Sequence, residues 1–336
     1  MNLPTAASDR LFNFRHAIDD PRVVFLLIVI GGLFAAAAVV IGALAGTGVI
    51  KGDLRKEIVQ RTLAWGVIAP ILIVPILLGA AWVMLLVTIM ALLCYREFAR
   101  ATGLFREKLM SALVVLGILA VNFAAFDHWY GLFVALPPLT IAVMTAGAIL
   151  SDRPKGYVQR VGLSALAFLL FGVCLAHLSY FANDPAYRPL LLLILLCVGL
   201  NDIFGFCVGK TIGGPKLCPN TSPGKTLSGA MGAMVLTTLT FVLLGGRALA
   251  GQPIGEMRFL IVLGLLLSLA GILGDLMISS VKRDVGVKDM GALIPGHGGV
   301  LDRCNSLLLA APALFHAIGY IQGVGLDQPM RIITGP

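Results

Sequence analysis

The sequence predicts an all-α, polytopic integral membrane protein, and three observations support this prediction. Of the 336 residues, 58% are hydrophobic and only 12% are charged, about half the charged fraction of a soluble globular protein. The apolar residues form runs of roughly 17–24 residues, the length that a helix needs to cross a bilayer. Because these runs do not alternate with polar residues, they also argue against a transmembrane barrel.

Ten candidate spans are distributed along the chain. Inside lipid every backbone group must find its partner within the protein, so each span is expected to be helical, with Pro70, Pro75, Pro137 and Pro138 kinking helices rather than ending them. We expect the first span to be a signal anchor or a partly interfacial helix. The predicted spans are 23–46, 62–78, 80–98, 109–126, 129–150, 161–181, 189–209, 226–246, 259–281 and 304–322.

The loops divide into two sets by their Lys and Arg content. Loops 47–61, 96–108, 151–160, 210–225 and 282–303 carry 18 of the 25 basic residues, and the opposite set carries 7. Since basic loops stay in the cytoplasm, we expect the first set to face the cytoplasm of a bacterial inner membrane, where nucleoside triphosphates are found. The same rule accounts for the net charge of +8, so we expect no nucleic-acid partner.

The densest cluster of charge lies in the segment from Gly274 to Ser306. Asp275, Ser279 and Lys282 follow at i, i+4 and i+7 and therefore share one face of the ninth predicted helix. Ionisable groups near a membrane core are costly, so their presence indicates function. The other charged residues of the segment are Arg283, Asp284, Lys288, Asp289, Asp302 and Arg303, and the glycine-rich run Pro295-Gly296-His297-Gly298-Gly299 lies among them.

This pattern favours metal-assisted chemistry on phosphates. Transfer at phosphorus requires cations against the phosphoryl oxygens and a metal ion that bridges the reacting groups. Mg²⁺ usually takes one or two carboxylates together with substrate phosphates, so Asp275 and Asp302 form the expected pair if the last two helices are neighbours. The alternative interpretation is a solvated interfacial loop held by local ion pairs.

A second segment runs from Asn201 to Thr226. Asp202 lies inside a predicted span, which indicates a site residue, although a helix-packing hydrogen bond is an alternative role. The residues from Ser222 to Thr226 resemble the end of a Walker A loop, but Pro219 occupies the position of its first glycine and no predicted strand precedes it. We therefore reject an ATPase and expect a phosphate-binding corner at a helix start.

Together these segments resemble the signature of the CDP-diacylglycerol synthases, also called phosphatidate cytidylyltransferases. That signature runs Ser-x-x-Lys-Arg, Lys-Asp, Pro-x-His-Gly-Gly and then Asp-Arg-x-Asp. The matching residues here are Ser279, Lys282-Arg283, Lys288-Asp289, Pro295-Gly296-His297-Gly298-Gly299 and Asp302-Arg303. The resemblance is densest over 199–315 and extends from about residue 61.

The resemblance implies a reaction in which CTP and phosphatidic acid give CDP-diacylglycerol and pyrophosphate at the bilayer. It also implies Mg²⁺ as cofactor with K⁺ as a second ion, and a homodimer. We accordingly expect an N-terminal extension with one extra transmembrane or interfacial helix (1–60), a membrane-embedded cytidylyltransferase domain of nine helices (61–325) and a flexible tail (326–336).

The charge pattern and the resemblance together give three groups of expected site residues, of which the resemblance itself assigns the metal ligands. The metal ligands are Asp275 and Asp302. The catalytic residues are Lys282, Arg283, Lys288, Asp289, His297 and Arg303. The substrate-binding residues are Asp202, Ser222, Lys225, Thr226, Asp284, Gly298, Gly299 and Asn305.

The chain departs from the signature at Asn305, where the family has its last Asp. An amide removes one negative charge and keeps an oxygen ligand, so metal affinity or substrate choice is expected to differ. The alternatives are an inactive or altered-specificity homologue, a related phospholipid or polyprenyl-phosphate transferase, and a transporter. The D-G-x-x-A-R motif of CDP-alcohol phosphotransferases is missing, and a transporter would place its charges near the midplane rather than at one membrane face.

Overall fold

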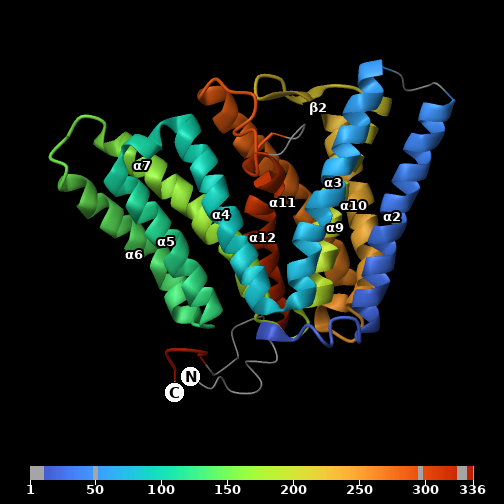
Figure 1. Ribbon diagram of the computed structural model, residues 1–336, viewed down its shortest axis with the longest axis horizontal. Coiled ribbons are helices and arrows are strands. Elements are labelled where there is room, and N and C mark those ends of the chain that lie inside the picture. The colour runs from blue at the N-terminus through green and yellow to red at the C-terminus, as the bar shows by residue number, and fades with distance from the viewer. Residues whose placement is uncertain (1–10, 48–51, 294–297, 324–330, 336) are drawn as a thin grey trace.

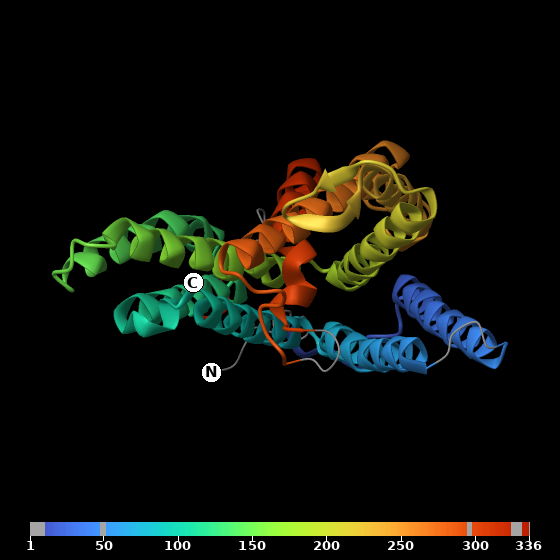
Figure 2. The same cartoon turned by 90° about the horizontal axis from the view of Figure 1, so that it is seen from above.

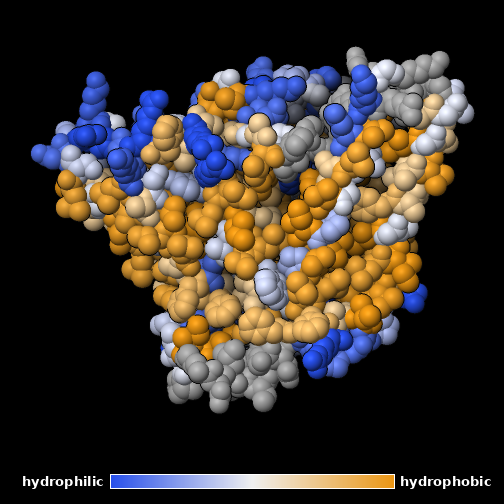
Figure 3. Space-filling model, in the orientation of Figure 1, coloured by the Kyte–Doolittle hydropathy of each residue, from blue (hydrophilic) through white to orange (hydrophobic). Residues whose placement is uncertain are grey.

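The computed structural model describes residues 11–47, 52–293, 298–323 and 331–335. Within these residues, ten helices are long and apolar enough to cross a membrane, and they stand side by side as one bundle (Figure 1). Figure 3 shows a broad belt of apolar residues between polar ends on this face. The predicted polytopic all-α membrane protein is thus confirmed.

The helices follow the predicted spans in order. The spans are α2 (Pro21–Gly46), α3 (Gly52–Leu78), α4 (Ala80–Thr102), α5 (Lys108–Phe126), α6 (Tyr130–Ile149), the composite of α7 (Tyr157–Ala167), the π-helical η2 (Phe168–Cys174) and α8 (Leu175–Phe181), then α9 (Tyr187–Ile212), α10 (Leu227–Ala248), α11 (Met257–Asp284) and α12 (Leu301–Gln322). Short 3₁₀ turns lie at η1 (Leu104–Arg106) and η3 (Pro253–Gly255). As predicted, Pro70, Pro75, Pro137 and Pro138 lie inside helices.

Helix ends differ from the predicted spans, most of all at α3. This helix begins at Gly52, ten residues before the predicted span, because a helix can continue beyond the apolar stretch that marks its passage through lipid. The domain boundary expected at residue 60 therefore falls inside a single helix.

The C-terminal ends of α2, α4, α6, α9 and α11 all lie at the same end of the bundle, the upper end in Figure 1. This is the end to which the alternation of basic loops assigns most Lys and Arg. We call it the hairpin end, because it carries the strands β1 (Lys216–Cys218) and β2 (Ser222–Thr226) between α9 and α10. Seen from above in Figure 2, this hairpin lies over the group formed by α9, α10 and α11.

The hairpin was not predicted from the sequence. Its strands are antiparallel, with Lys216 opposite Thr226 and Cys218 opposite Ser222. Such short strands with Pro and Gly among them show no alternating pattern, so they carry little sequence signal. Residues 222–226 thus form a strand themselves. In a Walker A motif the corresponding residues form a loop that follows a strand and wraps around phosphate, so the structure agrees with the rejection of that motif.

Two close helix crossings bring the hairpin end together. At Gly229 of α10, an added Cβ would lie 2.6 Å from the carbonyl oxygen of Gly205 in α9. At Gly274 of α11, it would lie 2.5 Å from the carbonyl oxygen of Asn305 in α12. Small residues at such crossings let membrane helices approach backbone to backbone.

At the opposite end of the bundle, the C-terminal segment contacts the turn between α5 and α6. Buried Asp127, which follows α5, accepts hydrogen bonds from the backbone N–H groups of Ile333 and Thr334, and its own carbonyl accepts one from Ile332 at 3.1 Å. Asp127 thus anchors the backbone of residues 332–334, within the tail that was predicted to be flexible over 326–336. Residues 326–330 and 336 lie outside the described part of the chain.

Replacing Gly229 by Ala should force α9 and α10 apart, because the nearest atoms to the new methyl group belong to backbone. We expect a loss of about 1–3 kcal/mol in stability, the usual penalty of overpacking. Thermal unfolding of the detergent-solubilised protein measures this loss. Gly246→Ala is the matched control in the same helix, because a Cβ there meets nothing within 4 Å; equal melting temperatures for the two variants would contradict the close crossing.

Candidate functional site

A cavity of about 620 Å³ opens at the hairpin end, between α9, the hairpin, α10, α11 and α12. It gathers most of the residues that the sequence analysis selected from two segments about 70 residues apart. The predicted site residues that line it are Asp202, Ser222, Lys225, Thr226, Asp275, Lys282, Asp289, Asp302, Arg303 and Asn305.

The first half of the cavity is built where α11 crosses α12. Because Gly274 has no side chain, the backbone of Asn305 lies against it and Asp275 comes beside the Asn305 amide. The Asn305 amide nitrogen donates to Asp275, and the amide oxygen accepts from the N–H of Ser306 at 2.7 Å. Asn305 therefore acts as a neutral partner of the Asp275 carboxylate.

Asp275 is also joined to the hairpin. The ammonium group of Lys225 forms an ion pair with the second carboxylate oxygen of Asp275. Both side chains keep between a fifth and a third of their surface accessible, so the pair faces the cavity rather than the protein core. This contact ties the two predicted segments together through one cation and one anion.

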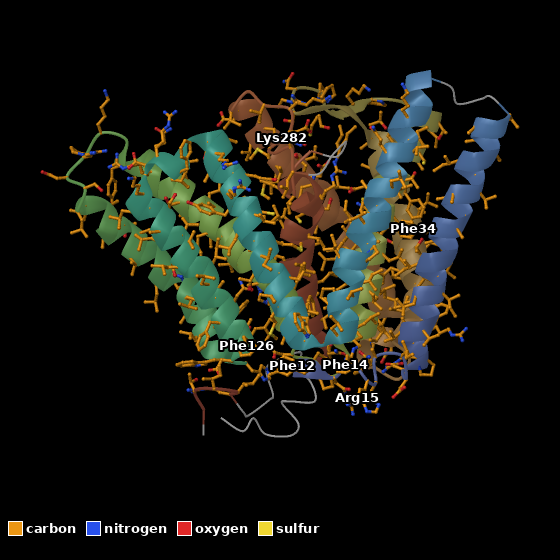
Figure 4. All side chains as sticks on the ribbon, viewed as in Figure 1. Phe12, Phe14, Arg15, Phe34, Phe126 and Lys282 are labelled. Carbon is orange, nitrogen blue, oxygen red and sulfur yellow. The ribbon has the colours of Figure 1, made fainter. Side chains whose placement is uncertain are left out.

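Asp302 forms the second charged centre. Its side chain is buried and pairs with the ammonium group of Lys282 at 3.0 Å. Its other oxygen accepts hydrogen bonds from the N–H groups of Met290 and Gly299, at 3.0 and 2.9 Å. Lys282 is labelled in Figure 4, near the hairpin end of α11. A carboxylate in the first turn of a helix is also favoured by the helix dipole.

Glu97 of α4 fixes the segment that leads into α12. Its buried carboxylate accepts hydrogen bonds from the N–H groups of Val300 and Leu301, at 3.0 and 2.9 Å. A Cβ on Gly291 or Gly299 would lie within 2.4 Å of this carboxylate. Glu97 thus holds the start of α12 and, through it, the position of Asp302.

The wall formed by α9 holds Asp202 and a buried hydrogen-bond centre at Asn201. The side-chain amide oxygen of Asn201 accepts from the hydroxyl groups of Thr237 in α10 and Ser268 in α11, at 3.0 and 2.5 Å. Asp202 accepts a longer bond of 3.5 Å from Ser306 of α12. These contacts join four helices at the wall of the cavity.

Four other predicted site residues do not line the cavity or lie outside the described part of the chain. Arg283 is exposed and donates to the backbone carbonyl of Thr221 at 3.2 Å. Asp284 and Lys288 are exposed and do not line the cavity. His297 belongs to the residues outside the described part of the chain.

The glycine pair and Thr226 have structural partners. Gly298 has φ of +79°, and a Cβ there would lie 2.9 Å from Asp302. Gly299 donates to Asp302 and abuts Glu97. The Thr226 hydroxyl group caps α10 by accepting from Gly229 N–H at 3.1 Å. These small residues therefore shape the cavity through packing and capping.

The donor set suits a hard divalent cation. Among the described residues, no group of three or more His, Cys, Asp or Glu side chains forms a metal site by itself. Mg²⁺ does not require one, because it usually takes one or two carboxylates and completes its shell with water and substrate phosphates. Asp275 and Asp302 line the same cavity and fit this role.

Two contributors were missed by the sequence analysis. Glu97 is one of three acidic residues inside the predicted spans, with Asp202 and Asp275, so the cost of burying charge was a signal that pointed to it. Asn201 carried a similar but weaker signal, because a polar residue in a span also serves helix packing.

The chain is similar in sequence to a known protein family and to individual bacterial proteins. The family described as "Cytidylyltransferase family" matches residues 59–321. The uncharacterized protein YnbB of Escherichia coli K12 is 30% identical over 263 residues, which cover 76% of this chain and 85% of the relative. The phosphatidate cytidylyltransferase of Rickettsia bellii is 36% identical over 46% of this chain and 71% of its own length. The phosphatidate cytidylyltransferase of Bacillus subtilis is 34% identical over 55% of this chain and 65% of its own length.

Glu97→Ala should loosen the start of α12. The backbone N–H groups of Val300 and Leu301 would lose their acceptors, which typically costs about 1–3 kcal/mol for each buried group left unpaired. Hydrogen–deuterium exchange should rise over residues 298–303 and stay unchanged in α9 and α10. Glu256→Ala, which removes an exposed carboxylate, is the control; unchanged exchange at 298–303 in Glu97→Ala would refute the positioning role.

Proposed function

Because this chain belongs to the cytidylyltransferase family, we propose that it transfers a cytidylyl group from CTP to phosphatidic acid. Family membership makes the chain a nucleotidyltransferase of the membrane that uses CTP. The lipid acceptor, the roles of individual residues and the cytoplasmic orientation of the hairpin end are parts of the proposal. The observation that supports it best is the cavity where Lys225 and Lys282 pair with Asp275 and Asp302.

The two lysines are suited to receive phosphate groups. In the structure each is held by one carboxylate, and an incoming triphosphate offers a larger negative charge to the same ammonium groups. Arg303 also lines the cavity and supplies a guanidinium group, which binds phosphate oxygens in a bidentate manner. We assign these three cations to the phosphates of CTP and of the lipid.

The two carboxylates are suited to Mg²⁺. When lysines turn to the phosphates, Asp275 and Asp302 become available as oxygen ligands, as Mg²⁺ prefers. A bound Mg²⁺ would neutralise phosphate charge and so favour displacement at phosphorus. The K⁺ ion and the homodimer implied by the resemblance stay predictions.

The proposed reaction is a direct displacement. An oxygen of the phosphatidate monoester forms a new bond to the α-phosphorus of CTP, and the bond from that phosphorus to the bridging oxygen of pyrophosphate breaks. Pyrophosphate leaves with the electron pair, and CDP-diacylglycerol stays in the bilayer. Lys225, Lys282 and Arg303 orient the two anions toward each other and reduce their repulsion.

Altered specificity is the second candidate, and Asn305 favours it. The amide of Asn305 donates a hydrogen bond to Asp275, whereas a carboxylate at this position would add negative charge beside it. Another lipid phosphomonoester as acceptor would use the same cavity and the same displacement. A transporter is disfavoured, because the charged residues lie at one end of the bundle.

The first test is direct. Purified protein in detergent with Mg²⁺, CTP and phosphatidic acid should release pyrophosphate and form a CDP-lipid. Asp275→Asn and Asp302→Asn should each lower the rate by more than about 100-fold, since even outer-shell partners of a metal site are worth about 10–100-fold. Glu256→Ala, at the opposite end of α11, is the folded control. Retained turnover in either Asp variant would remove that residue from the site.

The second test addresses Asn305. Asn305→Asp places a second carboxylate beside Asp275, so Mg²⁺ should bind more tightly. We expect the Mg²⁺ concentration for half-maximal rate to fall by about 10-fold, the scale of effects around a metal site. A magnesium titration of the initial rate measures this. If the Mg²⁺ concentration for half-maximal rate were unchanged or higher in Asn305→Asp, the neutral amide at 305 would not be what weakens Mg²⁺ binding.

A further inference from the structure

An apolar groove of about 250 Å³ runs between α2, α3 and α9. Its lining is hydrophobic along almost its whole length, with Thr62 as its only hydroxyl-bearing side chain among the described residues. Representative lining residues are Leu33 and Phe34 of α2, Trp65 and Leu72 of α3, and Leu196 of α9. Figure 4 labels Phe34, which lies between α2 and α3 in that view.

The groove and the polar cavity both include residues from one side of α9. Gly199 and Ile203 line the groove, and Phe206 and Lys210 line the cavity. These four residues are spaced i, i+4, i+7 and i+11, so they follow one another on the same side of the helix. The ammonium group of Lys210 lies 5.5 Å from the centre of the Phe206 ring, at the point where apolar lining gives way to charge.

An apolar lining that is followed by a cation along the same helix side suits the two parts of a phospholipid, its acyl chain and its phosphate group. An acyl chain requires a long apolar channel within the bilayer, and a phosphate headgroup requires a cation at the end of that channel. Lysine near a helix end can extend its ammonium group to the interface while its aliphatic stem covers apolar surface. Lys210 is placed for this task and was not selected by the sequence analysis.

One wall of the groove is specific to the N-terminal extension. The family match begins at residue 59, whereas α2 spans Pro21–Gly46. The extension therefore adds a wall to a groove that the matched region alone would leave open on that side. A helix in this position offers a surface that can select among acyl chains.

We propose that this groove binds an acyl chain of the lipid substrate, with its phosphate group at Lys210. The proposal rests on the proposed function and deepens it, because it assigns the lipid's path and gives α2 a role in chain selection. The lipid would enter from the bilayer, and CTP would enter the cavity from the hairpin end. The two substrates meet at the upper part of α9.

Gly199→Phe tests the groove. An added Cβ at Gly199 meets nothing within 4 Å, so the ring can occupy the groove without displacing backbone. Gly66→Phe is the matched control on α3, where a Cβ is equally unobstructed and the residue does not line the groove. Each variant is assayed with CTP on dioleoyl phosphatidic acid and on water-soluble dihexanoyl phosphatidic acid.

We expect Gly199→Phe to lower kcat/KM on the long-chain lipid by about 10-fold or more and to leave the short-chain lipid within about 2-fold, because the short chains need not fill the groove. Equal effects on both lipids, or no effect on either, would overturn the groove as a substrate site. If the unmodified protein turned over neither lipid, the proposed function itself would fail.

A binding measurement separates these failures further. Phosphatidic acid with a photoreactive diazirine on its acyl chain should label peptides of α2 and α3 that line the groove. An excess of unlabelled phosphatidic acid should suppress this labelling, and an equal excess of phosphatidylcholine should not. Labelling that both lipids suppress equally would identify ordinary bilayer lipid and overturn the proposal.

Discussion

The site depends on the close crossing of α11 and α12 at Gly274. Because this residue has no side chain, the backbone of Asn305 can lie against it. The crossing places the Asn305 amide on Asp275 and lets Lys282, two turns further along α11, reach Asp302 in the first turn of α12. Any larger residue at 274 would separate the two carboxylate centres.

Compensation of charge is the second constraint on this region. Carboxylates at a membrane boundary require partners, and the structure supplies Asp275, Asp302 and Glu97 with a cation, backbone N–H groups or both. Lys225 from the hairpin and Lys282 from α11 pair with Asp275 and Asp302, and Glu97 is satisfied by the start of α12. The resting site is thus neutralised by the same cations that we assign to phosphates.

The sequence predicted the spans and most of the charged residues of the cavity, for clear physical reasons. Apolar runs mark passage through lipid, and charge within or beside them marks residues that are expensive to place there. The start of α3 and the hairpin carry no such signal and were missed. The contacts of Glu97 with Val300 and Leu301 join residues about 200 positions apart, so only the fold reveals them. The groove also needs three helices in place before it exists.

We propose that one cavity brings a soluble nucleotide to a membrane lipid and joins them at the α-phosphorus. The most direct test uses CTP labelled either at its α-phosphorus or at its γ-phosphorus, with phosphatidic acid and the purified protein. We expect the α label to pass into the lipid phase while the γ label stays in water as pyrophosphate. Both labels remaining in water, or the γ label entering the lipid, would contradict it.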